Sequence, residues 1–192
     1  MRTAEITRTT RETDITLYLN LDGTGRADIN TGIGFYNHML TAFAVHSGFD
    51  LTVKAKGDLE VDCHHTIEDV GIVLGQAFAK AIDRSTIVRF GSFSVPMDEA
   101  LAECSLDISG RPYLVFNAHF NAPLIGQYDT SMTEHFFLSF ANNSGITLHI
   151  NVPYGRDDHH KAEAIYKAVA HSLKIAVQKS NNGGVLSSKG VL

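Results

Sequence analysis

Two stretches of the sequence decide the fold, Asp62-Cys-His-His-Thr-Ile-Glu68 and Asp157-Asp-His-His-Lys-Ala-Glu163. Each contains an adjacent histidine pair followed by a glutamate, and the two motifs stand 95 residues apart. A second pair of stretches, residues 38–48 and 135–145, is related by an offset of 97, and each begins with histidine and ends with Ser-Gly. Similarity at a nearly constant offset is typical of duplicated structural units, so the chain is predicted to consist of two repeats.

The two repeats, about residues 1–86 and 87–192, show the same order of predicted elements: strands, a shorter helix, another strand and a long helix. Strands are expected at residues 4–8, 14–21 and 50–55, and at 89–95, 100–108, 113–120 and 146–152. Helices are expected at 35–47, 64–83, 132–144 and 159–179, with Gly48 and Gly145 as C-caps of the shorter two. The sequence therefore predicts an α+β fold, a single domain of tandem duplicated half-domains. Each half has a small β-sheet and two main helices, and the halves pack about a pseudo-twofold axis.

The bulk composition excludes several classes of protein. The chain has 192 residues, is 44% hydrophobic and carries a net charge of -5, with no cluster of Lys and Arg for a nucleic-acid backbone. No apolar run approaches the roughly 20 residues that span a bilayer. The polar N-terminus, MRTAEITRTTRETD, does not resemble a secretory signal, and two cysteines make no disulfide framework. We expect a cytoplasmic protein without nucleic-acid or membrane partners.

The histidine motifs predict metal binding because of helix geometry. Residues three or four apart share a helix face, so Glu68 lies below the pair His64 and His65. Adjacent histidines diverge by about 100° around a helix, so each pair is expected to serve two different ions or two sides of an interface. Asp62 and Asp157 precede the helices and suit N-cap positions.

Histidines at matching places on the shorter helices complete the candidate ligand set. The eight side chains are His38, His64, His65, Glu68, His135, His159, His160 and Glu163. They suffice for two sites with about four ligands each, and imidazole plus carboxylate suits a divalent ion such as Mn or Zn. The four histidines without repeat partners, and Cys63 beside the first motif, are interpreted as structural or surface residues.

Several stretches together resemble one family. They are Gly32–Leu40, Cys63–Gly71, Met97–Leu101, Asn143–His149, Asp158–Ala164 and Ser187–Leu192. In order and extent they are similar to imidazoleglycerol-phosphate dehydratase, an enzyme of histidine biosynthesis. The resemblance implies dehydration of imidazole glycerol phosphate to imidazole acetol phosphate, two Mn²⁺ per active site, and a homo-oligomeric shell of 24 subunits with sites between subunits. Asn37 stands where the family usually has aspartate.

The resemblance also implies roles for individual residues. One ion would be held by His64, His135, His159 and Glu163, and the other by His38, His65, Glu68 and His160. Glu163 would act as base as well as ligand, and Glu12 would contact the substrate and carry a proton on its far side. The remaining substrate-binding positions are Arg89, Arg111, Lys167, Ser187, Ser188 and Lys189. The last three belong to a C-terminal segment, residues 185–192, that would close over the phosphorylated substrate.

Two other functions remain open from the residues alone. A dinuclear metallohydrolase would also use paired ions and phosphate-binding arginines, but it would need a carboxylate that bridges both metals. A non-catalytic metal-storage shell would suit the repeat, but it would leave the arginines and the Ser-Lys segment without a role. Conversion of imidazole glycerol phosphate in the presence of Mn²⁺ separates the three.

Overall fold

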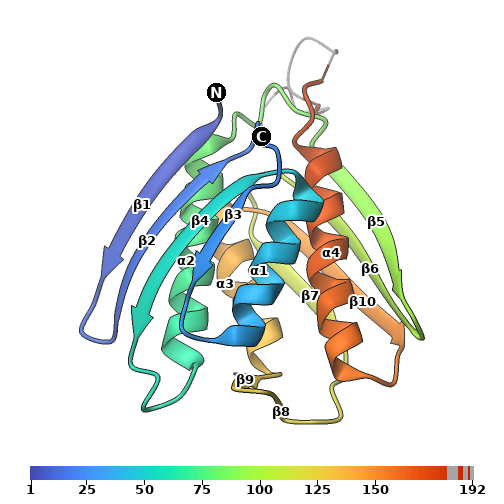
Figure 1. Cartoon of the computed structure of the whole chain (residues 1–192). Helices are drawn as coiled ribbons and strands as arrows, with labels where there is room; N and C mark the ends of the chain where they lie inside the picture. Colours follow the sequence, from blue (N-terminus) through green and yellow to red (C-terminus); the bar gives the residue numbers. More distant parts are fainter. Residues whose placement is uncertain (181–185, 188–189, 191–192) are drawn as a thin grey trace.

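The computed structural model describes residues 1–180, 186–187 and 190 (Figure 1). Its first half contains β1 (Thr3–Thr9), β2 (Thr13–Asn20), β3 (Ala27–Asn30), α1 (Gly34–Ser47), β4 (Asp50–Gly57) and α2 (His64–Ala81). Its second half contains β5 (Phe90–Met97), β6 (Ala100–Asp107), β7 (Tyr113–Asn117), α3 (Met132–Ser144), β10 (Thr147–Tyr154) and α4 (Asp158–Ala176). A small hairpin, β8 (Leu124–Ile125) and β9 (Tyr128–Asp129), is inserted between β7 and α3. Apart from that hairpin, the order of elements is the same in both halves.

The two main sheets have the same topology. The strand order is β1-β2-β4-β3 in one and β5-β6-β10-β7 in the other, so each sheet follows the first, second, fourth and third strand of its half. In both sheets the first two pairs of neighbouring strands are antiparallel and the last pair is parallel. The repeat seen in the sequence is therefore a repeat of the whole sheet-and-helix unit, as the predicted α+β duplication requires.

The four helices lie between the two sheets, which form the outer layers (Figure 1). Helix α2 covers β1 and β2, and α4 covers β5 and β6. Across the middle of the molecule, α1 packs against α4 and α2 packs against α3, so both helix contacts join one half to the other. The buried side chains of the sheets and helices form one continuous hydrophobic core.

The two helix contacts are built differently. Gly71 and Gly75 of α2 face α3, where a Cβ atom on Gly75 would lie 2.7 Å from the carbonyl oxygen of Phe140. The absence of side chains at these glycines allows the two helix backbones to approach closely. Helices α1 and α4 instead carry large rings, Tyr36 and Tyr166, which are fully buried and both pack against Phe136 of α3.

The C-caps of the shorter helices agree with the prediction. Gly48 and Gly145 have φ of 76° and 68°, the left-handed conformation that glycine adopts without steric cost, and each donates its N–H to the helix end. The predicted bounds agree with the observed ones to within two residues, except that β7 ends at Asn117 and α4 at Ala176, each three residues before the predicted end. Strand β3 was not predicted, because its burial pattern is nearly all exposed and has no alternation. No helix of the described residues has the length and hydrophobicity to cross a membrane.

Candidate metal centre

Both histidine motifs lie at the first turn of a long helix. Asp157 is the N-cap of α4, where its Oδ1 accepts hydrogen bonds from the backbone N–H of His159 at 2.8 Å and of His160 at 3.2 Å. Asp62 accepts from the N–H of His64 at 2.7 Å, although the cap of α2 is the next residue, Cys63. These hydrogen bonds stabilise the start of each helix, from which its histidines project.

The first cluster consists of His64 and Glu68 on α2 and His135 on α3. Nε2 of His64 lies 3.5 Å from Oε2 of Glu68, and Nε2 of His135 lies 3.4 Å from Oε1 of the same carboxylate. The two imidazole rings are 4.6 Å apart at their centroids. Two members of this cluster, His64 and Glu68, therefore come from the first half of the chain, and the third, His135, comes from the second half.

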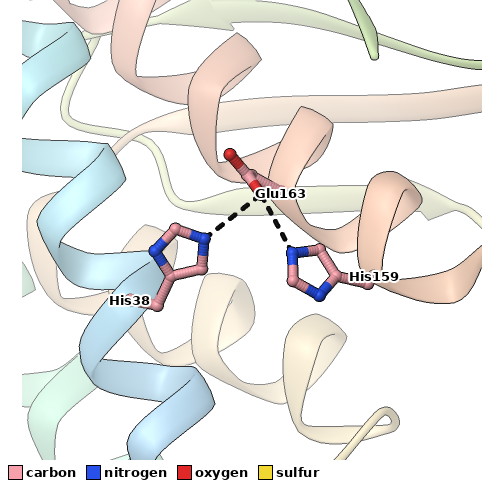
Figure 2. Close-up of side chains that lie close together, drawn as sticks. All are labelled: His38, His159 and Glu163. Atoms are coloured by element: carbon pink, nitrogen blue, oxygen red, sulfur yellow. Dashed lines mark hydrogen bonds and ion pairs between the residues drawn. The ribbon is translucent and has the colours of Figure 1, made fainter. Parts of the chain in front are cut away.

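The second cluster is the counterpart, with His159 and Glu163 on α4 and His38 on α1 (Figure 2). Oε2 of Glu163 lies 3.2 Å from Nε2 of His38 and 3.1 Å from Nε2 of His159. In both clusters the three donor atoms lie within 4.8 Å of one another. The sequence had predicted all six of these residues as ligands, and the structure brings them together in two groups of three.

The carboxylate of Glu163 is only 9% exposed and is surrounded by groups that favour its ionised form. Burial alone raises its pKa, but the Lys167 ammonium at 2.7 Å, with the hydrogen bonds of His38 and His159, outweighs burial and leaves the pKa below its usual value. Glu163 is therefore an anion at neutral pH, as a metal ligand or a general base must be.

The second histidine of each motif lies outside these clusters and is held through Nδ1 by another carboxylate. Nδ1 of His65 lies 3.0 Å from Asp58, and Nδ1 of His160 lies 2.8 Å from Glu99. These hydrogen bonds raise the pKa of both histidines. Nε2 of His65 faces Glu12 at 3.8 Å. Adjacent histidines thus do point to different places, as the helix geometry predicted.

The donor groups fit a divalent metal ion. Each cluster supplies two imidazole nitrogens and one carboxylate oxygen, the ligand types that Mn²⁺ and Zn²⁺ accept. Nε2 of His135 is buried without a hydrogen-bond partner among the described residues, although buried polar atoms are rarely left unpaired. An ion between the three donors would satisfy that nitrogen.

The expected division of ligands between two ions draws on both clusters at once. It joins His64 and His135 of the first cluster to Glu163 of the second. Within the described residues of one chain, no ion pair connects the two clusters. One chain therefore does not bring either expected four-ligand set together.

The two predicted phosphate-binding arginines share one carboxylate. Arg89 is buried and forms two hydrogen bonds to Asp107, at 2.6 and 2.9 Å, and a third to the carbonyl oxygen of Leu186. Its φ of 79° is unusual for a residue other than glycine. Arg111 lies 3.6 Å from Asp107 and is 68% exposed, so the group keeps a net positive charge.

The other predicted residues are placed as follows. Lys167 contacts Glu163, and its Nζ also lies 3.5 Å from the sulfur of Met97. Ser187 is half-buried and makes a noncovalent contact with another residue. Ser188 and Lys189 lie outside the described residues, as does most of the segment 185–192. Asn37 accepts hydrogen bonds from the N–H and hydroxyl of Thr31, so its amide oxygen braces the loop before α1.

Sequence reasoning missed the carboxylates that hold His65 and His160. Glu99 was inside the quoted stretch Met97–Leu101 but was given no role, although its place just before β6 matches that of Glu12 just before β2. Asp58 follows β4 and carries no signal in its neighbourhood, because only the tertiary structure brings it to His65.

Comparisons with known proteins identify the family of the chain. A sequence model described as imidazoleglycerol-phosphate dehydratase matches residues 31–173. The chain is 55% identical to the imidazoleglycerol-phosphate dehydratase of Methanosarcina barkeri over the full length of both, and 55% identical to that of Corynebacterium efficiens over all of this chain and 98% of the relative. The solved structure of the Staphylococcus aureus enzyme matches with a TM-score of 0.85 and 41% identity, covering 93% of this chain and 99% of that one. The Pyrococcus furiosus structure, in complex with (S)-C348, matches with a TM-score of 0.85 and 35% identity, covering 97% and 100%. By sequence and by structure, this chain belongs to the imidazoleglycerol-phosphate dehydratase family.

Proposed function

We propose that the chain is a metal-dependent hydro-lyase that converts imidazole glycerol phosphate to imidazole acetol phosphate and water, in the cytoplasmic pathway of histidine biosynthesis. The observation that carries the proposal is the pair of matching clusters, each with two imidazoles and one carboxylate ready for a divalent ion. Family membership supplies the reaction, and the clusters supply the groups that it needs.

We assign two Mn²⁺ ions to each active site, held by the eight residues expected from the sequence. Each ion would act as a Lewis acid that withdraws negative charge from the substrate's imidazole ring. The mixed nitrogen and oxygen donors, without a thiolate, favour this kind of ion. Cys63 is buried in the core and is not among the donors.

We assign proton transfer to two glutamates, Glu163 and Glu12. Glu163 is ionised and can accept a proton from the carbon next to the one that loses hydroxide. Glu12 is 54% exposed in the turn before β2 and is near His65, so it can carry a proton at the opposite side of the substrate. Neither carboxylate is a strong base, so accurate placement of the substrate must supply much of the rate.

The separation of the arginines from Glu163 supports an active site shared between subunits. The N–H of Arg89 donates to the carbonyl of Ala176 at the C-terminal end of α4, whereas Glu163 lies in its first turns. At a rise of 1.5 Å per residue these points are on the order of 20 Å apart. Only three carbons separate ring and phosphate in the substrate, which is short compared with this separation, so we infer that the arginines and Glu163 that act on one substrate come from different chains.

The two clusters lead to the same conclusion. If the first cluster and His65 of one copy meet the second cluster and His160 of another, eight donors surround two ions and the expected division of ligands is completed. We therefore propose a homo-oligomer with sites at subunit contacts, in the 24-subunit form that the family resemblance implies. The arginines and the Ser187–Lys189 segment would bind the phosphate, and Lys167, which contacts Glu163, is assigned as a further substrate-binding residue.

The test is turnover of imidazole glycerol phosphate by the metal-free protein with and without added Mn²⁺. We expect the ketone product only with metal, and no ketone from Glu163→Gln, which should still bind substrate. Release of inorganic phosphate instead of ketone would indicate the metallohydrolase, and metal binding without either product would indicate a storage protein. Full activity of Glu163→Gln would refute its role as base.

A further inference from the structure

The turn between β5 and β6 contains a carboxylate that touches the start of α4 in three places. Oε1 of Glu99 accepts hydrogen bonds from the backbone N–H of Arg156 at 2.9 Å and of Asp157 at 2.6 Å. Its other oxygen, Oε2, lies 2.8 Å from Nδ1 of His160. One side chain thus binds both the backbone that precedes the helix and a candidate metal ligand on it.

Glu99 has a counterpart in the first half, with different surroundings. Glu12 directly precedes β2 as Glu99 directly precedes β6, and both strands have eight residues. Glu12 is 54% exposed and lies 3.8 Å from Nε2 of His65, whereas Glu99 is 22% exposed and contacts Nδ1 of His160. In the first half Asp58 occupies the Nδ1 side of the histidine. The two turn glutamates therefore face opposite nitrogens of equivalent histidines.

We propose that Glu99 is a positioning residue for the metal site, which holds His160 through Nδ1 and thereby fixes the direction of its Nε2. The proposal rests on the proposed function, because it needs His160 to be a metal ligand. In the first half Asp58 has this place at Nδ1 of His65, so the counterpart Glu12 does not hold that nitrogen.

The chemistry of imidazole explains why the contact matters. A neutral histidine carries one ring proton, and a carboxylate next to Nδ1 keeps that proton there. Nε2 then presents a lone pair, which is what a metal ion requires, and loss of such a carboxylate typically costs 10–100-fold in metal affinity. Two other acidic side chains act on the ring through their charge: Asp98, which lies 3.5 Å from Nε2 and is 80% exposed, and Asp157.

The substitution Glu99→Gln tests the proposal with little change in shape. The retained oxygen can still accept from the backbone N–H groups of Arg156 and Asp157, which leaves the amide NH₂ facing Nδ1 of His160. Nδ1 must then accept a hydrogen bond, and the ring proton moves to Nε2. We expect the variant to bind Mn²⁺ about 10–100-fold more weakly in titrations of the metal-free protein. Glu5→Gln removes the same charge from the exposed face of β1 and should bind Mn²⁺ as the wild type does.

A double-mutant cycle shows whether Glu99 acts through His160. We expect Glu99→Gln to cause no further loss of Mn²⁺ affinity when His160→Ala is already present. Additive losses, or a Glu99→Gln variant that binds within twofold of wild type while His160→Ala binds weakly, would overturn the proposal. A wild-type protein that binds no Mn²⁺ would instead refute the metal centre of the proposed function. Thermal unfolding of each metal-free variant verifies that the fold is retained.

Discussion

Substitution of Gly75 by alanine should push α2 away from α3. The added Cβ would lie 2.7 Å from Cβ of Asn143, 2.7 Å from the carbonyl oxygen of Phe140 and 3.0 Å from the backbone nitrogen of Ser144. Two of these three atoms belong to the backbone of α3 and cannot rotate aside, so the helices must separate. Overpacking of this kind costs about 1–3 kcal/mol, and backbone contacts favour the upper end. Alanine is a better helix former than glycine by about 1 kcal/mol, so the net loss is about 2 kcal/mol of the free energy of unfolding.

The measurement is urea unfolding of the metal-free protein at one fixed concentration, with Gly34→Ala as the control. A Cβ on Gly34, the first residue of α1, would meet no atom within 4 Å, so that variant should be stabilised by about 0.4–1 kcal/mol. Because Glu68 on α2 and His135 on α3 share the first cluster, Gly75→Ala should also weaken Mn²⁺ binding, and Gly34→Ala should not. Equal or greater stability of Gly75→Ala would refute the close packing of α2 on α3.

Three further outcomes follow from the contacts of single side chains. Arg89→Met leaves the mostly buried carboxylate of Asp107 without its main partner and should destabilise the protein by about 3 kcal/mol in urea unfolding. Arg111→Met, at an exposed position, should change stability by less than about 0.5 kcal/mol. Both variants should raise the KM for the substrate. The thiol of Cys104, with its pKa raised by burial to about 12, should react with a thiol reagent only on unfolding, as followed by absorbance. Burial lowers the pKa of His46 and of His171 below the ordinary value of 6.5, so the native state binds fewer protons than the unfolded state, and the free energy of unfolding falls as the pH falls through that value. The variant His171→Gln should therefore lose less stability between pH 7.5 and 5.5 than the wild type does. An equal loss would exclude the two histidines as the cause.

Local patterns in the sequence were sufficient to predict the framework of the site. The i,i+4 spacing of His64 and Glu68, and of His159 and Glu163, places each pair on one helix face, and the structure shows both pairs in contact. The Ser-Gly endings of the shorter helices likewise identified their C-caps. These features depend on residues within one or two turns of each other, so no tertiary information was needed.

Features that depend on packing between halves were not predictable in this way. His135 joins Glu68, and His38 joins Glu163, only because α3 packs on α2 and α1 on α4. The equivalent placement of the two histidines in the repeat was visible, but their partners were not. The contact of Glu99 with His160 similarly depends on how a hairpin turn meets a helix.

The two clusters also bear on the origin of the chain. Each takes a long helix from one half and a short helix from the other, so neither half contains a complete cluster. An ancestor of half this length would have formed such a cluster only as a symmetric homodimer, and metal would have bound to the pair and not to the single chain. Formation of the three-residue cluster and association of the two copies would then have been one linked equilibrium, which gene duplication and fusion would have converted into the folding of a single chain.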